Sequence, residues 1–131
     1  KAYDVIVSNP PFFVEEVFCP DGRRNAARHS DGLGFDELLD AVARMLTADG
    51  SFSVILPSKA CDDFVSLAAM RHLYVHRLTW VQTKASALPK RVLLEMGRDV
   101  RAWQAERLPI MDGSSYAAEY KRLTRDFYLA F

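Results

Sequence analysis

Hydrophobic and polar residues alternate along the first half of the chain in a way that predicts two strands and two helices. Residues 3–8 and 51–56 are short apolar runs rich in β-branched and aromatic side chains, which is typical of buried strands. Residues 34–48 place apolar side chains at helical spacing, and we expect Gly50 to follow the end of that helix. Residues 60–72 predict a second helix. The order strand, helix, strand, helix is the repeating unit of a parallel sheet covered by helices.

The second half of the chain predicts a different arrangement. Residues 74–84 and 91–97 read as long strands joined by a short loop, and such strands are most simply antiparallel neighbours. Residues 108–111 predict a short edge strand, and residues 116–125 predict a last helix. Ser58, before the second helix of the first half, is the predicted cap of that helix.

A parallel sheet that finishes in an antiparallel pair resembles the second half of Rossmann-like class I methyltransferases. In that fold the last strand is inserted between its neighbours. The resemblance implies an α/β fold in which the strands of this chain are the fourth to the seventh of the sheet, namely residues 3–8, 51–56, 74–84 and 91–97.

Composition narrows the class of protein without identifying it. The 131 residues suffice for one domain, and 50% of them are hydrophobic while 26% are charged, as in ordinary globular proteins. Seventeen basic and seventeen acidic residues give no net charge, which excludes a bulk polycation but leaves room for local basic patches. Cys19 and Cys61 have no metal-like spacing, and we interpret them as reduced thiols. No apolar run reaches the roughly 20 residues of a membrane helix, so no membrane partner is expected.

The first strand ends in Asn9-Pro10-Pro11-Phe12, the stretch with the clearest chemistry. Two prolines supply no backbone N–H and disfavour helix in the residue before each, so the chain must leave the strand in a stiff, extended turn. The turn presents an amide side chain, carbonyl oxygens and an aromatic ring, which together suit a planar amine. A turn that merely ends a strand is the alternative, and the position directly after a buried strand favours the functional interpretation.

This tetrapeptide resembles the [Asn/Asp/Ser]-Pro-Pro-[Tyr/Phe] motif of amino methyltransferases, which use S-adenosyl-L-methionine. The resemblance implies that Asn9, Pro10, Pro11 and Phe12 form the catalytic amine-binding turn, and that Asn9 also contacts the cofactor. No metal site is predicted, because the three histidines lack ligand spacing.

The end of the chain makes the resemblance more specific. Asp112-Gly113, Tyr116, Glu119-Tyr120, Leu123-Thr124 and residues 126–131 are similar to the ending of bacterial tRNA (adenine-N6) methyltransferases, which modify the adenine beside the anticodon of a valine tRNA. That family implies tRNA as substrate and a cytoplasmic location. Two alternatives stay open: an amino methyltransferase for a protein glutamine or an rRNA guanine, and a catalytically inactive folding or interaction module.

Basic residues supply candidate contacts for nucleic acid. Arg24, Arg28 and His29 lie shortly after the turn, where a phosphate backbone would need them, although a solvated surface helix explains them equally well. Two further clusters could touch tRNA or be solvated faces: Lys84, Lys90 and Arg91, and Lys121, Arg122 and Arg125.

One departure from the family pattern affects the cofactor. Methyltransferases of the resembled class carry a Gly-rich loop after the first strand of their complete sheet and an acidic residue at the end of the second strand. The chain has neither feature. We therefore expect residues 1–131 to be a single partial domain, the C-terminal catalytic half without the cofactor-binding half, and to be inactive alone. The sheet edge beside residues 3–8 would then lack its usual neighbour, which predicts a homodimer through that edge.

Overall fold

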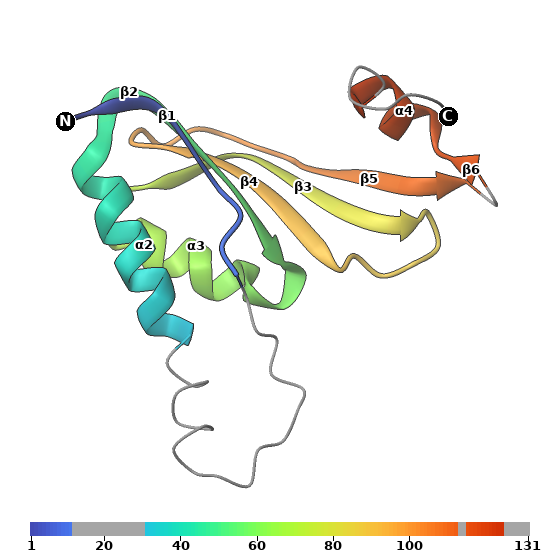
Figure 1. Cartoon of the computed structure of the whole chain (residues 1–131), viewed down its shortest axis with the longest axis horizontal. Helices are drawn as coiled ribbons and strands as arrows, with labels where there is room; N and C mark the ends of the chain where they lie inside the picture. The colour runs from blue at the N-terminus through green and yellow to red at the C-terminus, as the bar shows by residue number, and fades with distance from the viewer. Residues whose placement is uncertain (12–30, 113–114, 125–131) are drawn as a thin grey trace, which may run out of the picture.

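The structure, a computed structural model, describes residues 1–11, 31–112 and 115–124 (Figure 1). Within these residues the chain forms a six-stranded sheet in the order β1-β2-β4-β3-β5-β6. The strands are β1 (Tyr3–Ser8), β2 (Leu46–Pro57), β3 (Tyr74–Lys84), β4 (Arg91–Gly97), β5 (Ala105–Asp112) and β6 (Ser115–Tyr116). The described helices are α2 (Asp31–Met45), α3 (Cys61–Ala69) and α4 (Ala118–Thr124), with a short 3₁₀ turn at Ser58–Ala60.

The strand directions confirm the predicted insertion of the last long strand. β1 runs parallel to β2, and β4 lies between β2 and β3, antiparallel to both. β5 is parallel to β3. The carboxyl ends of β1, β2, β3 and β5 therefore lie along one edge of the sheet, the carboxyl edge.

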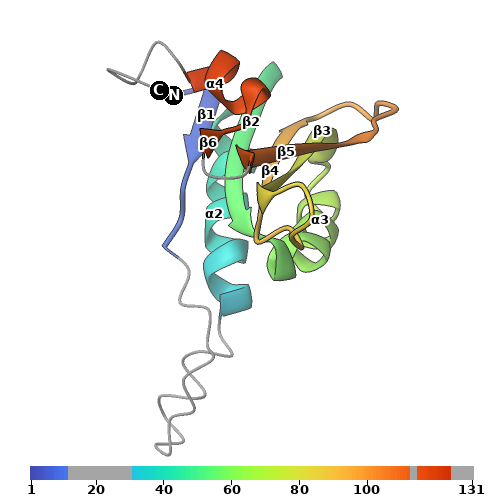
Figure 2. The same ribbon diagram turned by 90° about the vertical axis from the view of Figure 1, so that its right-hand side faces the viewer.

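One face of the sheet carries the core. From Gly50 onward burial alternates along β2 and turns Phe52, Val54 and Leu56 toward α2 and α3, because successive side chains of a strand point to opposite faces. Phe64 of α3 is completely buried, and its ring meets that of Phe35 in α2 edge-on, with 5.2 Å between centroids. The helix α4 lies over the other face, next to β5 (Figure 2).

The boundaries of the first helix differ from the prediction. The helix ends at Met45 rather than at Ala48, and Gly50 is a buried residue of β2 rather than a helix terminator. A Cβ atom at Gly50 would come within 2.6 Å of the Leu46 side chain, so the close approach of these two residues explains the glycine. The helix ends early because the guanidinium of Arg98 binds the carbonyl oxygens of Ala43, Leu46 and Thr47.

The second helix is also shorter than predicted, and Ser58 does not cap it. The Ser58 hydroxyl donates instead to the carbonyl oxygen of Pro89, at 2.7 Å, so it fastens the end of β2 to the β3–β4 loop. The predicted edge strand at 108–111 is longer, begins at Ala105 and is not at the edge, because β5 lies between β3 and the two-residue strand β6. The predicted helix at 116–125 is observed as α4, but it begins at Ala118, and Tyr116 belongs to β6.

Candidate functional site

The structure places the proline turn at the carboxyl edge of the sheet. Asn9 and Pro11 are exposed and Pro10 is partly buried, immediately after the last residue of β1. Ser8 lies opposite Val54 of the parallel strand β2, so the turn runs beside the end of β2. Ligand sites of open α/β sheets occur at such carboxyl ends. Phe12 lies outside the described residues, as do Arg24, Arg28 and His29.

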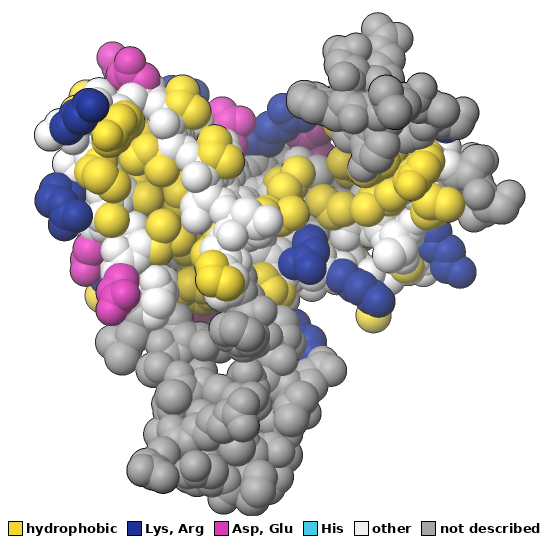
Figure 3. Space-filling view, viewed as in Figure 1, with side chains coloured by type: hydrophobic (Ala, Val, Ile, Leu, Met, Phe, Trp, Pro, Cys, Tyr) yellow, Lys and Arg dark blue, Asp and Glu magenta, His cyan; other side chains and the backbone are white. Residues whose placement is uncertain are grey.

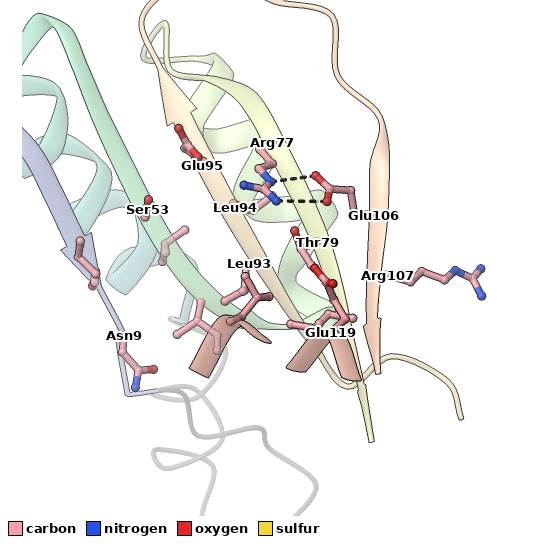
Figure 4. A pocket seen from close by; sticks show the side chains of 16 residues that line it. Asn9, Ser53, Arg77, Thr79, Leu93, Leu94, Glu95, Glu106, Arg107 and Glu119 are labelled. Atoms are coloured by element: carbon pink, nitrogen blue, oxygen red, sulfur yellow. Dashed lines mark hydrogen bonds and ion pairs between the residues drawn. The ribbon is translucent and has the colours of Figure 1, made fainter. Parts of the chain in front are cut away.

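A pocket of about 450 Å³ opens on the sheet face opposite α2 and α3, and Asn9 is one of its lining residues (Figure 4). Its apolar wall is formed by side chains of β1, β2, β4 and α4, namely Val7, Ile55, Leu93 and Leu123. Its polar lining includes Ser53 of β2 and Thr79 of β3. The pocket thus combines an apolar wall with a few polar groups, as small-molecule sites do.

An ion pair crosses the far wall of this pocket. Arg77 of β3 donates from Nε to Oε1 of Glu106 in β5 at 2.8 Å, and from Nη2 to Oε2 at 3.2 Å (Figure 4). The side chain of Arg107 points away from the pocket in the same view. The Arg77 hydrogen bond holds the pKa of Glu106 below its usual value, and Arg122 does the same for the pKa of Glu119 on α4. Both carboxylates are therefore ionised at neutral pH and can accept hydrogen bonds but not donate them.

The pocket adds residues that the sequence did not single out. Arg77 and Thr79 of β3 and Glu106 of β5 reach it, and so does Glu119 of α4, which the sequence had placed only in the family pattern of the chain's end. No pattern in the sequence had marked Arg77, Thr79 or Glu106 as site residues. Their juxtaposition follows from strand register, and Glu106 could not be assigned to a strand because the predicted strand began at residue 108.

The other candidate chemistry is limited. No group of three metal-ligating side chains lies together in the part of the chain that the structure describes. Cys61 is a free, buried cysteine, and burial raises the pKa of its thiol, which makes it a poor nucleophile. None of the described helices is both long enough and apolar enough to cross a membrane.

Comparison with curated proteins finds relatives along nearly the whole chain. The chain is 42% identical over 128 residues to a tRNA1(Val) (adenine(37)-N6)-methyltransferase of Bacteroides fragilis, covering 97% of this chain and 54% of that protein. It is 37% identical over 132 residues to the protein of the same name from Edwardsiella ictaluri, covering 53% of that relative. The chain spans about half the length of the curated relatives it matches. No protein-family model matches it.

The fold is also shared with a solved structure. A crystal structure of a predicted O-methyltransferase from Agrobacterium tumefaciens superimposes with a TM-score of 0.65 at 14% identity, over 98% of this chain and 53% of that one. Together with the strand order, this confirms that the sheet is part of a class I methyltransferase fold. The predicted resemblance to the bacterial tRNA adenine-N6 methyltransferase family is confirmed as well.

Proposed function

We propose that this chain, which is similar along its length to bacterial tRNA adenine-N6 methyltransferases, supplies the amine-binding turn for methylation of an adenine N6 amine in tRNA. The position of Asn9-Pro10-Pro11 supports this most directly. The turn is accessible at the carboxyl edge, and Asn9 borders the pocket. The names of the relatives supply the substrate class.

The chemistry of the turn follows from its donors and acceptors. The nitrogens of Pro10 and Pro11 carry no hydrogen, so this stretch of backbone offers carbonyl acceptors without N–H donors. An exocyclic amine is a weak nucleophile because its lone pair is delocalised into the ring. If the Asn9 side-chain oxygen and the Pro10 carbonyl accept its two hydrogens, the nitrogen is oriented and becomes more tetrahedral and more reactive. Phe12 would stack on the base, which contributes about 1–3 kcal/mol in comparable contacts.

The proposed substrate also assigns roles beyond the turn. Arg24, Arg28 and His29 are proposed to contact tRNA phosphates, since they are basic residues that follow the turn closely in the sequence. A cytoplasmic location follows from a tRNA substrate.

The methyl group would come from S-adenosylmethionine, and the described residues do not by themselves form a site for it. Asn9 is proposed to border the cofactor, but the glycines of the described part lie within helix α2, within β2 and at the end of β4, at Gly32, Gly34, Gly50 and Gly97. None of them forms a Gly-rich loop after a parallel strand, which is the usual cradle for such a cofactor. We therefore propose that a separate cofactor-binding half of the fold holds it.

The edge strand β1 fits this division. It pairs only with β2 among the described strands, and on its pocket side Val5 is 67% and Val7 is 73% exposed. Such an apolar open edge favours pairing with another strand. We propose that the cofactor-binding half covers it in the active protein, and that a second copy covers it when the chain is alone.

Substitution of Asn9 tests the proposal. In the longest protein that the gene encodes, Asn9→Ala should lower the single-turnover rate of tRNA methylation by about 100- to 1,000-fold, the usual effect of removing one preorganised polar contact. Asn9→Asp keeps an acceptor and should retain an intermediate rate. Gln104→Ala is the control, because it removes an exposed amide at the opposite end of the sheet. A wild-type rate for Asn9→Ala would refute the proposal.

A further inference from the structure

We propose that the β3–β4 loop is a preformed contact for the phosphate backbone of the substrate RNA. The basic loop is defined as residues 84–91, and its cations are Lys84, Lys90 and Arg91. This inference rests on the proposed function and adds to it the surface on which the RNA lies.

The basic loop lies on the same edge of the sheet as the amine-binding turn. Arg91 is opposite Pro57 in the pairing of β4 with β2, and Ser8 is opposite Val54 in the pairing of β1 with β2. β1 and β4 flank β2, so these two strands are separated by two strand spacings, about 10 Å at the usual 4.8 Å per strand. A polynucleotide with one base in the turn would carry its neighbouring phosphates past the loop.

The charges of the loop are uncompensated. Lys84, Lys90 and Arg91 are exposed, and none of the three makes an ion pair within the described part of the chain. Residues 82–91 contain no Asp or Glu. Figure 3 shows Lys and Arg side chains gathered along this side of the sheet. Phosphate contacts require free cations of this kind. When such a cation neutralises a phosphate, the RNA releases a bound counterion, and this release favours binding.

Elsewhere, several described arginines already have acidic partners. Arg71 binds Asp36 and Asp40, and Arg77 binds Glu106. On α4, the second basic cluster that the sequence suggested, Arg122 pairs with Glu119. Arg125 lies outside the described residues, so α4 offers there only Lys121 without an ion pair, and we favour the loop as the contact for a polyanion.

The loop is also held in one conformation by buried hydrogen bonds. Gln82 is only 2% exposed, and its side-chain nitrogen donates to the carbonyl oxygens of Ala87 at 2.7 Å and Ala85 at 3.3 Å. The Ser58 hydroxyl donates to the carbonyl oxygen of Pro89, and the Ser58 backbone N–H donates to the carbonyl oxygen of Lys90. Apolar packing does not explain this order, because Leu88 is 86% exposed. A loop fixed in advance loses less conformational entropy when a ligand binds.

The charges are tested with a triple variant, Lys84→Gln, Lys90→Gln and Arg91→Gln, in the longest protein that the gene encodes. Binding of an unmodified tRNA transcript is measured between about 50 and 200 mM salt. Each lost phosphate contact should lower the slope of log K against log salt by about 0.7–0.9, and three lost contacts should weaken binding roughly 100-fold near 0.1 M salt. The charge-matched control replaces Lys1, Arg44 and Arg101, three exposed cations toward the opposite end of the sheet.

The order of the loop is tested separately with Gln82→Met. This change keeps every cation and removes the two hydrogen bonds to the loop, so tRNA binding should weaken several-fold while the salt slope stays unchanged. Ser58→Ala should have a smaller effect of the same kind.

The outcomes separate the two proposals. An unchanged affinity and slope for the triple variant, in a protein that methylates tRNA, would overturn the inference and leave the function standing. Polyglutamate serves as a probe for acidic proteins. If the triple variant lost polyglutamate binding but kept tRNA binding, the loop would be a contact for an acidic protein, and the inference would also be overturned. A wild-type protein that neither binds nor methylates tRNA would overturn both proposals.

Discussion

Replacing Arg98 with methionine should destabilise the chain far more than replacing its neighbour Arg101. The guanidinium of Arg98 donates from Nη2 to the carbonyl oxygen of Ala43 at 2.6 Å, and from Nη2 and Nε to that of Leu46. These carbonyls lie at the carboxyl end of α2 and in the first residue of β2, where no helical N–H follows. Methionine keeps most of the aliphatic stem and removes the donors.

The expected loss follows from these contacts. A hydrogen bond to a charged group contributes about 1.5–3 kcal/mol to stability, and the helix dipole adds at most about 1 kcal/mol at an exposed terminus. Arg98 is only partly buried, so we use the lower end of the range for each hydrogen bond. The contact to Thr47 is long, at 3.4 Å, so we count only the carbonyl oxygens of Ala43 and Leu46. The free energy of unfolding should fall by about 3 kcal/mol. Arg98→Lys keeps the charge without the planar fork and should lose about half as much.

Urea unfolding of the 131-residue chain, followed by circular dichroism, measures this loss. Arg101→Met is the matched control, because Arg101 pairs with Asp99 at 2.8 Å while both side chains are about 60% exposed. Such exposed pairs contribute little to stability, because water screens them. If Arg98→Met and Arg101→Met lowered the free energy of unfolding equally, with the same m value, the carbonyl contacts of Arg98 would not explain where α2 ends.

Two further predictions concern acid and cofactor. Arginine partners lower the pKa of Asp99, Glu106 and Glu119, so their stabilisation is complete above the unfolded pKa, near 4, and is lost as the pH falls through that range. The free energy of unfolding should therefore decrease from about pH 5 to pH 3, less steeply in Glu106→Gln, and identical profiles would contradict this. Calorimetric titration of S-adenosylmethionine into the 131-residue chain should show no binding in the micromolar range, and a micromolar Kd would contradict the proposed division of the fold.

The sequence predicted the elements well and their ends less well, for a physical reason. It was wrong about the burial of residues 3–8, because β1 lies at the edge of the described sheet and none of its residues is buried. The spacing of Phe35, Leu39 and Val42 depends on a local period, so it identified α2 correctly. The end of that helix depends on Arg98, a residue 55 positions beyond its acceptor Ala43, which no local pattern reveals.

The site shows the same division between local and distant information. The turn at Asn9 was predicted because two prolines dictate its geometry wherever they occur. The pair of Arg77 with Glu106 was not predicted, since it depends on the parallel register that places Thr79 opposite Glu106. Likewise Gln82 has no distinctive neighbours in the sequence, and its role appears only when the loop folds back over it.

The turn and the basic loop together account for the kind of substrate that the site should accept. In the proposed site an amine would meet acceptors at the Asn9 side-chain oxygen and the Pro10 carbonyl, while the backbone nitrogens of Pro10 and Pro11 offer a keto oxygen no donor. We therefore propose that the turn favours amino groups. It does not distinguish a nucleobase amine from a glutamine amide, because both present N–H donors. We propose that selection of RNA over protein comes from charge at the same edge. Lys84, Lys90 and Arg91 provide this charge, because a polynucleotide brings several phosphates to them and a glutamine side chain brings none.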